Sequence, residues 1–266
     1  MSFASEGFLW PGLSEWITKH RSENPIHFEL ADRFNRVCLR ALTACSVPDS
    51  DNLRLVVSLL FARALSSFQG GLLMVERGMS TEALTLARSC LESSFYLAAT
   101  VRNPACIDRM ISSDTKHKRG TIRWLKSPAA AIAEFPPEQV HELINQLERA
   151  APSEEEPLQI WWAAEQAEMS EIYETFYRDL CNRAAHPSLS SLQRHMTRNA
   201  DNEIDGLSFA PEKTETRNII LGLITALHPA VDGAGKVFPM TDECSRELNA
   251  CWETYVQLNR APDAAS

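Results

Sequence analysis

The segment 52-NLRLVVSLLFARALSSFQGGLLMVERGMSTEALTLARSCLESSFYLAATVR-102 decides the fold. In its first half, apolar residues such as Val56 and Leu60 recur at intervals of three and four, which is the spacing of one buried helix face. Gly78 offers a stop, and the sequence STE at 80–82 is a typical start for a second helix. The segment therefore predicts an antiparallel helical hairpin with a very short turn.

The same periodicity continues along the chain. It predicts further helices at residues 25–46, 105–126, 137–150, 158–186, 188–198, 212–228 and 242–259. Only DGLSFAP at 205–211 reads as extended, either as a surface loop or as one arm of a short hairpin. We expect an all-α fold, a single bundle of about eight to ten helices. Residues 1–23 are predicted to be an N-terminal extension, 24–260 one all-α domain and 261–266 a flexible tail.

Composition limits the class of protein. With 266 residues, 44% of them hydrophobic and 23% charged, the chain can bury a large core. Its net charge of -9 argues against indiscriminate binding to nucleic acid or anionic lipid. The seven cysteines form no C-x-x-C pair and no disulfide framework. The start resembles no signal peptide, and the longest apolar stretch, 219–227, is half of a membrane span. We expect a cytoplasmic protein without a membrane span.

Charge is unevenly distributed. Asp114 is the one acidic residue among six basic ones between positions 109 and 126, namely Arg109, Lys116, Lys118, Arg119, Arg123 and Lys126. Between 134 and 174 the acidic residues dominate in turn. The two segments complement each other or merely face solvent, or else the first is an anion-binding patch beside Trp124. We expect Lys116, Lys118, Arg119 and Arg123 to be mostly exposed.

Two charged residues lie at the edge of the apolar face of the 80–100 helix. Arg88 projects just beyond Phe95 on a helical wheel, and Glu92 follows one turn later. They are either an Arg–Glu pair that fixes helix packing or an anchor for an anionic ligand. Arg63, on the preceding helix, shares its face with Leu59 and leaves the same two interpretations.

A second polar line lies on the 170–186 segment. Asp179, Asn182 and His186 follow one another at i, i+3 and i+7, beside an apolar arc that includes Tyr177. Pro187 favours a helix end at His186, where the helix dipole stabilises a protonated ring. His186 is a candidate general acid–base group, or a residue that caps the helix end.

Motifs for cofactors are absent from the sequence. No G-x-x-x-x-G-K-[ST], G-x-G-x-x-G, H-E-x-x-H or G-x-S-x-G occurs, and we expect no cofactor. A di-iron bundle needs two Glu-x-x-His pairs, and the chain has only Glu138-x-x-His141. We therefore predict no metal.

The chain resembles an uncharacterised bacterial family of all-helical proteins, classed as a domain of unknown function. The resemblance covers roughly residues 50–230 and rests on the R-x-x-x-E helix and on a helix that ends in H-P-S at 186–188. This chain has Cys181 where the family pattern has Ser. A fainter similarity is to helical toxin and defence ribonucleases, but neither Arg178 nor Arg183 has their spacing to His186.

These residues lead to two functional hypotheses. In the first, Arg88, Glu92 and His186 form a polar pocket with Arg63, Tyr177 and Asn182. This pocket binds a nucleotide or an RNA end, and His186 would transfer the proton if the protein catalyses a reaction. In the second, the protein is a non-catalytic interaction or scaffold module, and the network is structural. We predict that the Arg88–Glu92 edge packs against the C-terminal half of the 170–186 segment, with His186 or Asn182 in reach. A His186 that lies far from both residues and points into solvent would favour the second hypothesis. Homo-oligomer formation is left open.

Overall fold

The computed structural model describes residues 2–47, 50–127, 136–149, 156–185 and 189–260. Helices α4 (Asn52–Glu76) and α5 (Ser80–Arg102) form the central hairpin, which confirms the prediction for 52–102. Asp51 caps α4 by accepting a 2.9 Å hydrogen bond from the Arg54 backbone N–H. Gly78 makes the turn with φ of 70°, a conformation that glycine adopts without a steric cost.

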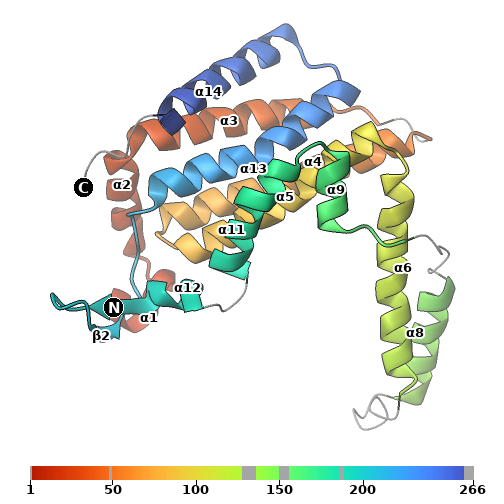
Figure 1. The fold of residues 1–266 in the computed structure, drawn as a ribbon, viewed down its shortest axis with the longest axis horizontal. Coiled ribbons are helices and arrows are strands. Elements are labelled where there is room, and N and C mark those ends of the chain that lie inside the picture. Colours follow the sequence, from red (N-terminus) through yellow and green to blue (C-terminus); the bar gives the residue numbers. More distant parts are fainter. Residues whose placement is uncertain (1, 48–49, 128–135, 150–155, 186–188, 261–266) are drawn as a thin grey trace.

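A third central helix completes the core of the bundle. Helix α13 (Thr216–Val237) packs along both α4 and α5, and α3 (Pro25–Thr43) and α14 (Asp242–Arg260) lie over it (Figure 1). Gly71 allows the close approach, because a Cβ there would lie 2.5 Å from Leu223 Cδ2. The largest fully buried rings are Phe34, Phe61, Phe68 and Phe95, each stabilising the fold by about 1.5–3 kcal/mol. The all-α prediction is confirmed.

The N-terminal residues are also helical. They form α1 (Phe3–Glu6), η1 (Gly7–Leu9) and α2 (Leu13–Glu23). On α2, His20 is buried and its ring contacts both Glu76 on α4 and Thr216 on α13. Helix α2 is therefore attached to the bundle by a buried polar contact. The domain boundary at residue 24 stays a prediction, and the expected tail at 261–266 lies outside the described residues.

Two helices extend away from the bundle as an arm (Figure 1). They are α6 (Cys106–Leu125) and α8 (Pro137–Arg149), close to the predicted ranges 105–126 and 137–150. The basic α6 and the acidic α8 are joined by a 2.7 Å ion pair between Lys126 and Glu148. Several basic side chains of α6, among them Lys116 and Arg119, are exposed on this arm.

The predicted helix at 158–186 is interrupted. Helix α9 (Ile160–Gln166) ends in a turn in which Glu168 has φ of 58°, a conformation that stops a right-handed helix. The chain resumes as α10 (Ser170–Ile172), η2 (Tyr173–Tyr177), α11 (Arg178–Leu180) and η3 (Cys181–Ala185), and η2 and η3 are π-helical. An apolar spacing near 3.6 residues does not distinguish a continuous α-helix from a helix with such interruptions and π-helical turns.

Two other predicted helices also need correction. Residues 189–198 form α12 (Leu189–Leu192), η4 (Gln193–His195) and strand β1 (Met196–Arg198), which pairs antiparallel with β2 (Ile204–Leu207). The extended segment expected at 205–211 is thus a strand only as far as Leu207. Helix α13 does not end at His228 but continues past Pro229, because the buried packing of its last two turns outweighs the lost backbone hydrogen bond.

Helix α4 is the one described helix that is long and apolar enough to cross a membrane, with a mean hydropathy of 1.4 in its most apolar window. Of that window, 44% is buried inside the protein. A core helix of a soluble protein gives the same pattern, so its composition alone does not identify a membrane span.

Candidate functional site

The Arg88–Glu92 edge of α5 packs against η2 and η3, as predicted. Arg88 Nη2 lies 2.7 Å from Glu92 Oε1 and donates a 3.2 Å hydrogen bond to the Tyr177 hydroxyl. The Tyr177 hydroxyl in turn donates to Glu92 Oε1 at 2.7 Å. Arg88 Nε donates to Cys181 Sγ at 3.2 Å. Four side chains from two segments, which we call the Arg88 cluster, thus form one connected polar network.

The Arg88 cluster is half-buried and keeps its charges paired. The side chains of Arg88 and Glu92 are 29% and 24% exposed. Burial opposes the charge on Arg88, but the bonds to Tyr177 and Cys181 and the nearby Glu92 outweigh burial and raise its pKa. Burial, followed by the hydrogen bond to Glu92, raises the pKa of Tyr177. At neutral pH the tyrosine is therefore a neutral donor between a cation and an anion.

The π-helical geometry of η2 and η3 aims these side chains at α5. Each π-helical turn inserts a residue, which rotates the helix face, and such turns are frequent at functional sites. Tyr173 and Tyr177 stack with ring centroids 5.2 Å apart, and Tyr177 packs edge-on to Phe95 on α5. The stacking fixes the Tyr177 hydroxyl at the carboxylate of Glu92. The local structure thus serves the contact between the two segments.

The structure places the other predicted site residues as follows. Arg63 is exposed on α4, on the same stripe as Leu59, which is 60% exposed, so the expected inward-facing arginine is wrong. The apolar periodicity of α4 is wide enough to admit two faces, and the structure buries the other one. Asn182 is exposed on η3. His186 lies outside the described residues, so its contact with Arg88 or Glu92 and its acid–base role stay predictions.

Cys181 is the member of the Arg88 cluster that sequence reasoning missed. The one signal in the sequence was that Cys181, four residues after Tyr177, stands where the family pattern has serine. The hydrogen bond that Cys181 accepts from Arg88 could not be read from the sequence, because it depends on the π-helical turn.

A second candidate site lies on the arm. An open groove of about 650 Å³ runs along α6 and is bordered by residues 157–159; we call it the α6 groove. Lys116, His117 and Trp124 line it, and Trp124 is 47% exposed. Leu158 fixes the border, because its backbone N–H donates to Ser113 Oγ at 2.7 Å. The α6 groove therefore combines an exposed indole with positive charge.

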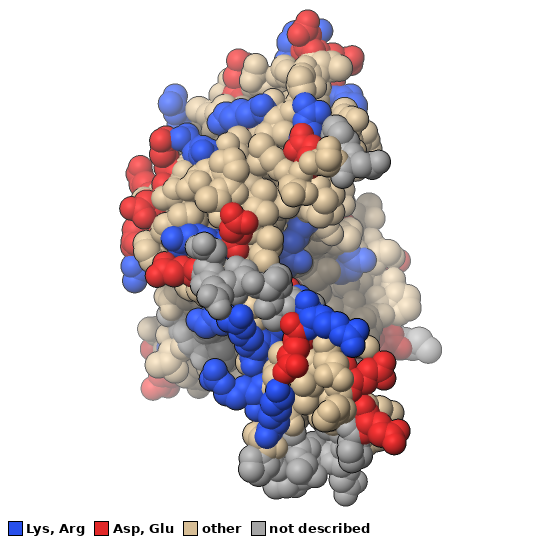
Figure 2. Space-filling view, turned by 90° about the vertical axis from the view of Figure 1, so that its right-hand side faces the viewer, with Lys and Arg blue, Asp and Glu red and all other residues tan. Residues whose placement is uncertain are grey.

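Of the four basic residues expected to be exposed, Lys116, Arg119 and Arg123 are exposed, whereas Lys118 is half-buried and pairs with Asp114. Among the described residues, the side chains of Lys116, Arg119 and Arg123 have no hydrogen-bond or ion-pair partner. Figure 2 shows Lys and Arg side chains gathered on the lower part of the molecule, where the arm lies. Of the acidic run at 154–156, Glu156 pairs with Arg109 at 3.5 Å, and 154–155 lie outside the described residues.

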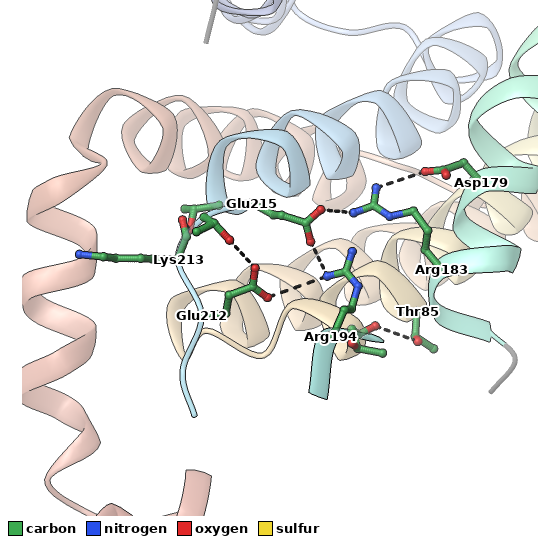
Figure 3. Close-up of polar contacts among 10 residues, drawn as sticks. Thr85, Asp179, Arg183, Arg194, Glu212, Lys213 and Glu215 are labelled. Atoms are coloured by element: carbon green, nitrogen blue, oxygen red, sulfur yellow. Dashed lines mark hydrogen bonds and ion pairs between the residues drawn. The ribbon is translucent and has the colours of Figure 1, made fainter. Parts of the chain in front are cut away.

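A third polar group joins η3, η4 and the start of α13 (Figure 3). Glu215 accepts from both Arg183 and Arg194, and Arg194 also lies 3.9 Å from Glu212. Asp179 pairs with Arg183 at 3.2 Å. Only this last i,i+4 pair was readable from the sequence. The group ties the chain on both sides of residues 186–188 to α13.

No described set of three or more His, Cys, Asp or Glu side chains lies close enough together to hold a metal ion. All seven cysteines are free thiols.

The comparison with protein families matches residues 54–204, more than half of the chain, to the Family of unknown function (DUF5677). The chain belongs to this family, which confirms the resemblance to an uncharacterised domain. Neither the curated proteins nor the solved structures gave a match.

Proposed function

We propose that this member of the family binds single-stranded RNA through the α6 groove, without catalysing a reaction on it. The observation that carries the proposal is the pairing of Lys116 with the exposed Trp124 in this groove, with two further unpaired cations, Arg119 and Arg123, exposed on the same helix. Proteins that hold single strands combine a positive groove for the phosphates with aromatic rings on which bases stack. Lys116 and Trp124 supply both parts within the groove.

The charge distribution supports a local site. A chain with a net charge of -9 repels a polyanion at long range, so affinity has to come from a concentrated patch. Three cations without partners on two turns of α6 supply one, because no carboxylate has to be displaced before a phosphate binds. Paired arginines elsewhere, such as Arg178 with Glu174 at 2.7 Å, are already neutralised.

The Arg88 cluster supports a structural role rather than a ligand pocket. Each of its four side chains has an internal partner, so an anion would compete with Glu92 for Arg88. This is the second hypothesis of the sequence analysis, applied to this part of the molecule alone. By contrast, Lys116 in the α6 groove, and Arg119 and Arg123 elsewhere on α6, have no internal partner among the described residues.

The test measures the fluorescence anisotropy of a labelled 20-nucleotide single-stranded RNA. The double charge reversal Arg119→Glu/Arg123→Glu should weaken binding at least about tenfold and lower the salt slope of log K by about 1.4, two phosphate contacts at 0.7 each. The matched control is Arg178→Glu/Arg198→Glu, which reverses two exposed arginines elsewhere and should leave affinity within about threefold.

A further variant separates stacking from charge. Trp124→Leu should weaken RNA binding and leave binding of inorganic polyphosphate, which has no bases, unchanged. The proposal is wrong if wild-type protein does not bind the RNA, or if the α6 double variant binds as well as the control. If Trp124→Leu loses RNA binding and polyphosphate binding equally, the proposal that bases stack on Trp124 is wrong.

A further inference from the structure

A second cavity, separate from the α6 groove, lies at the start of α5. It has a volume of about 270 Å³ and is bordered by the Gly78 turn, by η4, by residues 208–212 and by Phe8. This volume is just below the range of about 300–1,000 Å³ for ligand sites, so it suits a small molecule. Nothing in the proposed RNA binding uses this cavity.

The N-terminus of α5 supplies unsatisfied donors to this cavity. The N-cap residue, Met79, has no side-chain cap, and the first bond of the helix runs from Ala83 N to Met79 O. Among the described residues, the backbone N–H groups of Ser80, Thr81 and Glu82 have no acceptor. Such a helix start attracts a carboxylate or another anionic group through its dipole and its free N–H groups.

Ser80 gives independent evidence for a ligand. Its side chain lines the cavity and the residue is only 7% exposed, yet its hydroxyl has no hydrogen-bond partner in the described part of the chain. The hydroxyl oxygen is not completely sealed from solvent, and because Ser80 lines the cavity, it opens onto that space. Buried hydroxyls are normally bonded, and an acceptor placed at the helix start would satisfy this one.

The charges around the cavity select the kind of anion. Two carboxylates, Glu82 and Glu212, border it, whereas its one arginine, Arg194, is shared between Glu212 and Glu215 (Figure 3). Glu212 is held beside the helix start, because its backbone N–H donates to Gly78 O at 3.0 Å. A phosphate dianion would add two negative charges here. A zwitterion adds none, and its ammonium group can pair with a glutamate.

Aromatic side chains form the remaining wall. Phe8 and Phe209 pack edge to face with centroids 5.4 Å apart, and Phe209 is 67% exposed. Such a surface favours an apolar group on the ligand, because covering it removes apolar area from water.

We propose that this cavity binds a free α-amino acid with an apolar or aromatic side chain. The carboxylate of the ligand accepts from Ser80 and from the free N–H groups of α5. Its ammonium group pairs with Glu212 or Glu82, and its side chain packs on Phe209.

The test is calorimetric titration of the full chain with L-phenylalanine and with two analogues that each lack one pole. We expect L-phenylalanine to bind, and 3-phenylpropanoate and 2-phenylethylamine to bind at least about tenfold more weakly. Ser80→Ala and Glu212→Gln should each weaken L-phenylalanine binding about tenfold. Ser58→Ala, at a partly exposed serine of α4 that does not line this cavity, is the matched control.

Thermal unfolding checks that the variants are folded, and a substitution that lowers the melting temperature is replaced by Ser80→Cys or Glu212→Asp. No binding of L-phenylalanine or L-leucine up to 10 mM would overturn the proposal, as would equal binding of 3-phenylpropanoate. Tighter binding of phenyl phosphate than of L-phenylalanine would assign a phosphate ligand and also overturn it. The α6 variants should bind L-phenylalanine normally, so the two proposals fail separately.

Discussion

The hydroxyl of Tyr177 donates a 2.7 Å hydrogen bond to Oε1 of Glu92, although 85 residues separate the two along the chain. The same oxygen lies 2.7 Å from Arg88 Nη2. Tyr177 is 6% exposed, so the contact is shielded from water by the stacked Tyr173 ring and by α5. One carboxylate therefore joins the central hairpin to the π-helical segment.

Arg88→Ala should lower the free energy of unfolding by about 1–3 kcal/mol, because it leaves the half-buried Glu92 with Tyr177 as its remaining partner. Urea denaturation at pH 7 measures the change. The matched control, Arg178→Ala, breaks the exposed i,i+4 pair of Arg178 with Glu174 and should cost less than about 0.5 kcal/mol. Unchanged or increased stability in Arg88→Ala would instead indicate a functional pocket, as the first hypothesis requires.

Cys181→Ser should keep or slightly raise stability, by up to about 1 kcal/mol. The serine oxygen is a better acceptor than a thiol for the guanidinium N–H of Arg88, which now lies 3.2 Å from the sulfur. Cys181→Ala removes the acceptor and should cost about 1 kcal/mol. Thermal and urea unfolding of the two variants side by side measure the difference. Equal stability of the two variants would mean that Arg88 gains nothing from this contact.

The central hairpin was predictable because its signals are local. The apolar spacing of 52–76 and the glycine at 78 need no knowledge of the rest of the chain. The contact of Arg88 with the 170–185 segment was also predictable, because two polar residues bordering apolar faces must meet in a single core.

What could not be predicted depends on distant contacts. Arg63 and Leu59 share a face that reads as buried, but α13 and α5 cover the other side of α4. The π-helical turns at 173–177 and 181–185 leave no mark in the apolar pattern. In the sequence, Ser80 indicates only the start of a helix. The cavity at its hydroxyl depends on residues 208–212, which are distant in the chain.

Gly78→Ala should destabilise the protein by more than about 1 kcal/mol. A Cβ at this residue would lie 2.5 Å from the Glu212 backbone N, and φ of 70° disfavours any side chain. Gly120→Ala is the matched control, because its Cβ meets nothing within 4 Å in the middle of α6. That change should stabilise by about 0.5–1 kcal/mol. Melting temperatures that move in the same direction would contradict the description of the Gly78 turn.

His20 should make stability depend on pH below neutrality. Its buried ring lies 2.7 Å from Thr216 Oγ1 and 3.3 Å from Glu76 O, and burial is the main cause that lowers its pKa from 6.5. The unfolded chain thus binds a proton more readily than the folded one does. The stabilisation is complete above pH 6.5 and is lost as the pH falls below that value.

Urea midpoints of wild type, His20→Gln and the exposed-site control His141→Gln, measured at pH 7.5, 6.5 and 5.5, test this. We expect His20→Gln to lose less stability on acidification than wild type, while His141→Gln follows wild type, since His27 and His228 remain in all three proteins. Parallel losses in all three would exclude His20 as a source of the pH dependence.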